Sequence, residues 1–111
     1  MAIKIFIKRQ VPAEKEEKVM ALIKRLRSLA VAQPGYISGE TLRSVANPDE
    51  YLVISNWQTV EDWKAWESSK ERSDIQNRID ALLGGKTTYD AYYHPQRGGA
   101  RLSGFKGWEG G

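Results

Sequence analysis

The spacing of apolar residues along the chain predicts six regions of regular secondary structure. Isoleucine occupies every second position of residues 3–8, which is the period of a strand with one buried face. After Pro12, which suits the first turn of a helix, apolar residues recur at spacings of three and four. This predicted helix ends at Gln33-Pro34-Gly35, and its apolar stripe consists of Val19, Leu22, Ile23, Leu26 and Ala30.

Three further strands are predicted in the remainder of the chain. Residues 36–45 and residues 51–57 are consecutive strand candidates, and the Asn-Pro-Asp sequence at 47–49 between them is a turn signal. These two strands are therefore expected to pair as a hairpin. Residues 87–93 are rich in Thr and Tyr, which favours a fourth strand.

Two capping signals divide the second helical region. Thr59 is followed three residues later by Asp62, and the same spacing recurs at Ser68 and Glu71. We therefore expect a helix to start at each signal, with a break near residues 68–69. Gly-Gly after the last apolar position ends the region. The apolar positions of the two segments are Trp63, Trp66, Ile75, Ile79, Leu82 and Leu83.

The order strand, helix, strand, strand, helix, strand predicts an α+β fold of the ferredoxin-like βαββαβ type. In this fold an antiparallel sheet carries both helical regions on one face. We assign residues 1–94 to this domain and residues 95–111, with six glycines, to a C-terminal extension. Three apolar side chains of the extension are candidates for docking onto a partner subunit or the pocket mouth, or for recognition by a separate protein, unless the extension is unstructured. They are Leu102, Phe105 and Trp108.

The predicted sheet is apolar on both faces. In the first strand the isoleucines share one face, while Phe6 lies on the other. In the third strand Leu52 and Ile54 lie on one face, and Tyr51 and Val53 lie on the opposite one. A strand that is apolar on both sides is usually buried on both sides. We therefore expect a homodimer, in which the same sheet of a second subunit covers the face that the helices leave open.

Charge and composition exclude several classes of function. The chain has 111 residues and a net charge of +3, but residues 1–94 hold 14 basic and 13 acidic side chains and are nearly neutral. A broad basic surface for nucleic acid is therefore not expected. The third strand also lacks the glycine that RNA-recognition domains of the same topology carry there.

The few potential metal ligands and the absence of long apolar runs narrow the possibilities further. The chain has no cysteine, so it has neither disulfides nor cysteine metal sites, and its one histidine, His94, has no carboxylate nearby in sequence. We expect no metal. No apolar run approaches the length of a membrane span, and the N-terminus does not resemble a secretory signal. A cytoplasmic protein is the resulting expectation.

Three features in sequence suggest a family. A Pro-Gly turn lies within residues 33–39, the strand over residues 51–57 ends in Trp57, and a Trp-x-x-Trp pair follows at Trp63 and Trp66. Over about residues 2–94 the chain thereby resembles the antibiotic biosynthesis monooxygenase domain of the dimeric α+β barrel superfamily. The resemblance implies a homodimer, and a pocket lined by aromatic residues between the helices and the sheet.

The resemblance implies one of two chemistries. Some members are cofactor-independent monooxygenases that oxidise polycyclic phenols to quinones with molecular oxygen. In those members a strand Trp and a helix Tyr match Trp57 and Trp63. Their strand Asn falls on Val53, which cannot form a hydrogen bond, and Asn56 is expected on the opposite face.

Other members of this family bind and degrade haem. Their second-helix Trp matches Trp66, but Gln76 or a neighbour stands where they have the histidine that binds iron. Their first-strand Asn falls near Ile7 or Lys8. Because both the iron ligand and the distal polar group are missing, we expect no haem degradation and no cofactor. Haem binding without turnover would be a third possibility and would need His94 as the axial ligand.

The leading hypothesis is a monooxygenase or oxidase that uses molecular oxygen on a hydroquinone or polycyclic phenol. The candidate substrate-binding residues are Trp57, Trp63, Trp66 and Val53, while Tyr51 and His94 are candidates to contact the phenol oxygen. The two helical Trp residues could equally be core residues. The alternative is a non-catalytic dimeric module that binds a small molecule or a protein. A polar group inside the pocket would favour the oxidase, and a purely apolar lining would favour the module.

Overall fold

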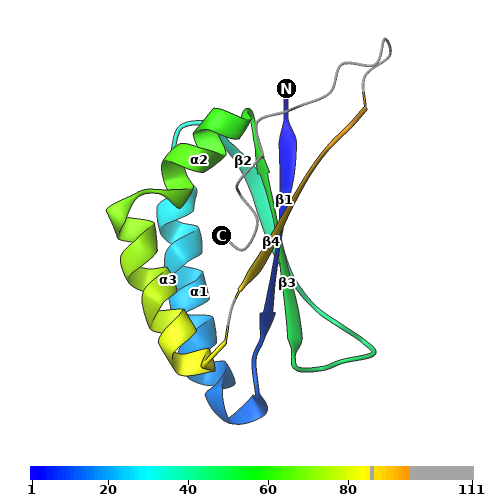
Figure 1. Cartoon of the computed structure of the whole chain (residues 1–111), viewed down its shortest axis with the longest axis vertical. Helices are drawn as coiled ribbons and strands as arrows, with labels where there is room; N and C mark the ends of the chain where they lie inside the picture. The colour runs from blue at the N-terminus through cyan, green and yellow to red at the C-terminus, as the bar shows by residue number, and fades with distance from the viewer. Residues whose placement is uncertain (86, 96–111) are drawn as a thin grey trace.

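The computed structural model describes residues 1–85 and 87–95 (Figure 1). The strands within these residues form one antiparallel sheet in the order β2-β3-β1-β4. Figure 1 shows the helices together on one side of this sheet, as the predicted ferredoxin-like α+β fold requires. The elements are β1 Ile3–Gln10, a 3₁₀ turn Ala13–Lys15, α1 Glu16–Ala30, β2 Tyr36–Arg43, β3 Glu50–Trp57, α2 Val60–Glu67, α3 Lys70–Leu83 and β4 Thr88–Tyr93.

The core lies between the sheet and the helices. On β1 the buried face consists of alternate residues, of which Ile3 and Ile5 are at most 1% exposed. On β3 the same face carries Tyr51, Val53, Ser55 and Trp57, so Tyr51 and Val53 share a face opposite Leu52 and Ile54, as predicted. The helices contribute a matching stripe, and the five apolar positions predicted for α1 are all buried.

The breaks between helices follow the capping signals with one correction. The Thr59 hydroxyl accepts a hydrogen bond from the Asp62 backbone N–H at 3.0 Å, as predicted. The predicted cap at Ser68 is wrong, because Ser69 caps α3 and accepts from the Arg72 N–H at 3.2 Å. Ser68 instead ends α2, where its hydroxyl donates to the Lys64 carbonyl at 2.9 Å. Two adjacent serines satisfy the two helix ends separately.

Gly35 joins α1 to β2 in a conformation that favours glycine. Its φ is +83°, and a Cβ built there would lie 2.1–2.6 Å from side-chain atoms of Asp62 at the start of α2. Its carbonyl accepts a hydrogen bond from the Gln58 N–H at 2.8 Å, which fixes the turn against the end of β3. The Pro-Gly signal in the sequence therefore marks a contact between two segments as well as the end of a helix.

Gly35→Ala is expected to lower the free energy of unfolding by about 1–2 kcal/mol, because the backbone would be strained and Asp62 would have to move. Denaturant unfolding of both proteins measures the difference. Gly85→Ala is the matched control, since its φ is not positive and its Cβ would find its nearest atom 3.9 Å away. Equal losses at the two glycines would contradict this account of the turn.

The face of the sheet away from the helices is partly apolar. Phe6 pairs in register with Ile54 on β3, and the Phe6 ring lies 5.0 Å from the ring of Tyr92 on β4. Leu42 on β2 and Tyr92 are 45% and 57% exposed. The homodimer through this face stays a prediction, and the extension with Leu102, Phe105 and Trp108 lies outside the described residues. Within the described part of the chain, no helix has both the length and the apolar character to cross a membrane.

Candidate functional site

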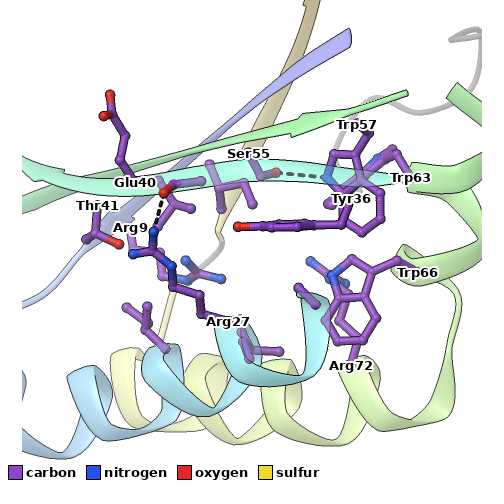
Figure 2. Close-up of a pocket in the computed structure, with 16 residues that line it drawn as sticks. Arg9, Arg27, Tyr36, Glu40, Thr41, Ser55, Trp57, Trp63, Trp66 and Arg72 are labelled. Atoms are coloured by element: carbon purple, nitrogen blue, oxygen red, sulfur yellow. Dashed lines mark hydrogen bonds between the residues drawn. The ribbon is translucent and has the colours of Figure 1, made fainter. Parts of the chain in front are cut away.

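A pocket lies between the helix-facing side of the sheet and the helices (Figure 2). The cavity has a volume of about 60 Å³. At roughly 10–15 Å³ for each ordered water, this equals a few waters. The candidate residues Trp57, Trp63, Trp66 and Val53 all line it.

Aromatic side chains form one wall of the pocket. The Trp57 ring contacts Tyr36 and Trp63 edge to face, at centroid distances of 5.4 Å and 5.8 Å. The Trp57 indole N–H donates to the Ser55 hydroxyl at 3.1 Å, and both side chains are buried. These edge contacts fix the ring of Trp57. Trp66 reaches the pocket from the end of α2.

Tyr36 lies across the pocket. Figure 2 shows its ring between β3 and Trp66, with the hydroxyl toward the end where Arg9 and Arg27 lie. A Cβ at Gly39 would be only 2.7 Å from the Tyr36 hydroxyl oxygen, so the absence of a side chain at Gly39 makes room for the phenol. The exposed Arg27 donates to the Gly39 carbonyl and bridges α1 to the edge strand β2. Tyr36 and Arg27 therefore control how wide the pocket is on this side.

Arg9 places a positive charge inside the site. It follows Ile3, Ile5 and Ile7 on the buried face of β1 and is only 3% exposed. Its Nη2 donates to Gln76 Oε1 at 2.7 Å, while its Nε is buried and has no hydrogen-bond partner among the residues that the structure describes. Burial, with a smaller contribution from the nearby Arg72, lowers the pKa of Arg9 to about 10, although Tyr89 and Asp80 act to raise it. The guanidinium is therefore still charged at neutral pH.

A polar network behind the pocket orients Gln76. Its amide nitrogen donates to Asp80 Oδ1 at 2.8 Å and to the Thr87 hydroxyl at 2.9 Å. Thr87 in turn donates to the same Asp80 oxygen at 3.2 Å. These bonds hold the amide so that its carbonyl oxygen points at Arg9. Gln76 is thereby engaged on both sides.

Arg72 is a second cation in the lining. It is 6% exposed, and its guanidinium carbon lies 5.5 Å from the Trp63 ring centroid and 5.2 Å from that of Tyr89. It donates to the Tyr89 hydroxyl and, in a long contact of 3.4 Å, to the Glu67 backbone carbonyl. The aromatic faces and neutral oxygens around it stabilise the charge.

Other residues singled out in the sequence lie elsewhere. Tyr51 is buried but does not line the pocket. Its hydroxyl donates a hydrogen bond to Glu16 and accepts one from Arg43. His94 is exposed after the end of β4. Asn56 lies on the opposite face of the sheet, as expected, and accepts a hydrogen bond from Lys4 Nζ at 2.8 Å.

Sequence reasoning missed the two arginines, Ser55 and Tyr36. The sequence contained a signal for Arg9 and Ser55, because each occupies an alternate position on the buried face of its strand. Arg9 follows the three isoleucines, and Ser55 lies between Val53 and Trp57. Arg72 carries a weaker signal, one helical turn before Ile75 and Gln76. Within residues 1–85 and 87–95 no cluster of three or more His, Asp or Glu side chains could hold a metal ion.

Comparison with solved structures shows the same fold. A conserved protein from Methanosarcina mazei Go1 superposes with a TM-score of 0.77 at 23% identity, covering 83% of this chain and 91% of that one. SnoaB from Streptomyces nogalater, described as a cofactor-independent oxygenase, superposes with a TM-score of 0.75 at 14% identity, covering 86% and 95%.

Comparison by sequence finds a relative and a family that match this chain. Protein SchA of Streptomyces halstedii is 26% identical over 70 residues, which is 63% of this chain but only 18% of that protein. This chain therefore matches a small part of a much longer relative. The family described as antibiotic biosynthesis monooxygenase matches residues 2–78, the part of the chain that supplies every residue discussed for the pocket except Asp80, Thr87 and Tyr89. The chain belongs to the antibiotic biosynthesis monooxygenase family.

Proposed function

We propose that this domain is a cofactor-independent monooxygenase or oxidase that acts on a small aromatic phenol or hydroquinone with molecular oxygen. The observation that supports the proposal is the combination of aromatic walls with buried polar groups in one pocket. Trp57, Trp63 and Trp66 offer apolar surfaces to a ring, while Ser55 and two buried arginines face the same space. A purely apolar lining would have favoured a binding module.

The proposed chemistry needs little from the protein. A phenol that loses its proton becomes electron-rich enough to transfer electrons to oxygen directly. When a phenol ring CH becomes C=O to give a quinone, one oxygen atom of O₂ enters the product and the other leaves as water. When a hydroquinone becomes a quinone, O₂ takes up two electrons and two protons and leaves as hydrogen peroxide. In both reactions the substrate supplies all the electrons. The protein has to hold the ring, stabilise the anionic form and keep bulk water away.

The described residues suggest how the substrate proton leaves. Among the described residues that line the pocket, Glu40 is the one carboxylate, and Figure 2 shows its side chain directed away from the cavity. With His94 exposed at the end of β4, the described lining offers no side chain suited to act as a general base. We infer that the proton passes to solvent at the pocket mouth and that the positive charge of the site favours this loss.

Pocket size separates the two classes of substrate. A cavity of about 60 Å³ is small, so a single-ring hydroquinone requires less rearrangement than a polycyclic phenol. A polycyclic phenol would require Tyr36 to swing out and Arg27 to release the Gly39 carbonyl. Both side chains lie at the partly exposed edge of the pocket, where such movement meets least resistance.

Oxygen uptake by the purified protein tests the proposal. The panel contains hydroquinones, anthrones and polycyclic phenols, without added flavin or metal. We expect uptake above the spontaneous rate with at least one compound, and a fall of about tenfold or more in Trp66→Leu, which loses a wall for the ring. Trp66→Phe keeps an aromatic face and is expected to retain most of the activity.

Circular dichroism and unfolding curves would show that both Trp66 variants are folded. If no panel compound is consumed faster than its spontaneous rate, while the same compounds quench the tryptophan fluorescence, the non-catalytic binding module would be favoured instead. Val53, at the position where phenol-oxidising members have Asn, is the feature of the chain that fits this alternative.

We further propose that the domain works as a homodimer through the open face of the sheet. Ile54→Glu would place a charge in the middle of that face, beside Phe6, and is expected to yield a monomer. Light scattering coupled to size-exclusion chromatography measures the mass. Val31→Glu, at an exposed apolar residue just after α1, is the control and should leave the mass of the wild type unchanged. A wild-type protein that is monomeric at high concentration would refute the dimer.

A further inference from the structure

We propose that Arg9 forms an anion subsite at the end of the pocket away from Trp57 and Trp63, and that the ligand binds there as a phenolate whose negative oxygen accepts a hydrogen bond from Arg9 Nε. The proposal specifies the ionic form of the ligand. Its catalytic meaning rests on the proposed oxidase function, although binding of the anion can be measured separately.

The unpartnered donor is the first observation. Arg9 is 3% exposed, yet its Nε has no hydrogen-bond partner in the described part of the chain, while Nη2 is satisfied by Gln76 at 2.7 Å. Buried N–H groups almost always find an acceptor, and a charged donor left without one is particularly unfavourable. Because Arg9 lines the cavity, a ligand oxygen is the natural acceptor for this group.

The charge balance around Arg9 points to an anion. Its direct partner is the neutral amide of Gln76, and the carboxylate of Asp80 lies on the far side of that amide at 2.8 Å from the Gln76 nitrogen. The neighbouring cation Arg72 donates to two neutral oxygens. Among residues 1–85 and 87–95, no carboxylate thus binds directly to either of the two buried guanidinium groups that face the pocket. A negatively charged ligand would supply the missing counter-charge.

The network behind Gln76 makes this a prepared site. Asp80 and Thr87 both accept hydrogen bonds from the Gln76 amide nitrogen. The amide therefore cannot turn that nitrogen toward Arg9 without losing both hydrogen bonds. The Gln76 oxygen therefore holds the guanidinium by one edge and leaves Nε available. A carboxylate at position 76 would neutralise Arg9 directly, whereas the amide positions it and preserves its charge.

The remaining walls select the kind of anion. Trp57, Trp63 and Trp66 offer aromatic surface, and the small cavity favours a single ring over a polycyclic one. A phenolate joins these two requirements in a single small molecule, with an apolar ring and one charged oxygen. An opposite charge within about 4–6 Å typically lowers the pKa of such a group by one to three units. The subsite would thereby generate the reactive form of the substrate at neutral pH.

Absorbance titration with 4-nitrophenol tests the subsite, because phenol and phenolate absorb at different wavelengths. With wild-type protein we expect the pKa of the bound probe to fall by about one unit or more, equivalent to about tenfold tighter binding of the phenolate than of the phenol. Arg9→Met is expected to abolish this shift, while Arg9→Lys, which keeps the charge, should retain part of it. Arg78→Met, on the exposed side of α3, is the matched control and should behave as wild type.

The outcomes separate this inference from the oxidase proposal. A wild-type protein that binds the probe with an unchanged or raised pKa, or that binds neither form, would overturn the subsite even if Arg9→Met failed to fold. An unchanged shift in a folded Arg9→Met protein would overturn it as well. A lowered pKa that depends on Arg9, found in a protein without oxygen uptake on the full panel, would support the subsite and argue against the oxidase. Oxygen uptake without any change in the pKa of the probe would support the oxidase and overturn the subsite.

Discussion

Trp57→Ala is expected to lower the free energy of unfolding by about 3–5 kcal/mol, the usual range for removing a fully buried large aromatic side chain. Trp57 is 0% exposed and is the last residue of β3, where it joins the sheet to α2. Its ring contacts Tyr36 and Trp63 edge to face, and its N–H satisfies the Ser55 hydroxyl. The substitution would remove all three interactions and extend the pocket into the core.

Chemical denaturation of the wild type and the variant measures this loss. Val31→Ala is the control, because Val31 is 57% exposed just after α1, away from the proposed dimer face, and is expected to change the stability by less than about 1 kcal/mol. Trp57→Phe separates packing from hydrogen bonding, since it keeps a ring but leaves Ser55 without its donor. A loss at Trp57 no larger than that at Val31 would contradict the position of the core.

The fold was predictable because its signals are local. The isoleucine alternation assigns the buried face of β1, and the two capping signals locate both helix starts to within one residue. The error of one residue at Ser69 has a simple reason. Two serines stand side by side, and the sequence alone does not reveal which of them takes the extended backbone conformation of an N-cap.

The candidate site was predictable only in its apolar part. Trp57, Trp63 and Trp66 follow from strand parity, helical spacing and the family resemblance, and all three line the pocket. The polar part depends on contacts between distant residues: Arg9 and Gln76 are 67 positions apart and meet only because β1 is a central strand covered by α3. No spacing rule connects two such positions.

One polar position still carried a readable signal. When a charged residue follows the alternate buried positions of a strand, it either lies in solvent beyond the end of the strand or is itself buried. β1 extends to Gln10, past the predicted end at residue 8, so Arg9 is buried. The predicted strand stopped just short of Arg9. The longer strand places its guanidinium inside the domain, where it becomes the most informative polar group of the pocket.

Arg9→Met is expected to raise the free energy of unfolding by about 2 kcal/mol at neutral pH, although Arg9 lies at the centre of a polar network. Burial lowers the pKa of Arg9 to about 10, which corresponds to about 3 kcal/mol against the charged form in the fold. Because the folded-state pKa lies below that of the unfolded chain, the penalty is fully present at neutral pH and is relieved only above pH 10. The lost hydrogen bond to Gln76 offsets about 1 kcal/mol of the gain.

The sign of this change distinguishes a functional charge from a structural one. If Arg9 served mainly to hold Gln76 and the helix layer, Arg9→Met would destabilise the domain, and Arg9→Lys would be the better tolerated of the two. If the charge is kept for a ligand, the methionine variant gains stability and loses the anion, and 4-nitrophenolate stabilises only the wild type against thermal unfolding. Thermal unfolding of the wild type and the Arg9→Met variant, each with and without the probe, gives both comparisons in one experiment. A destabilised variant that still responds to the probe would assign Arg9 to the core and leave the pocket without its proposed anchor.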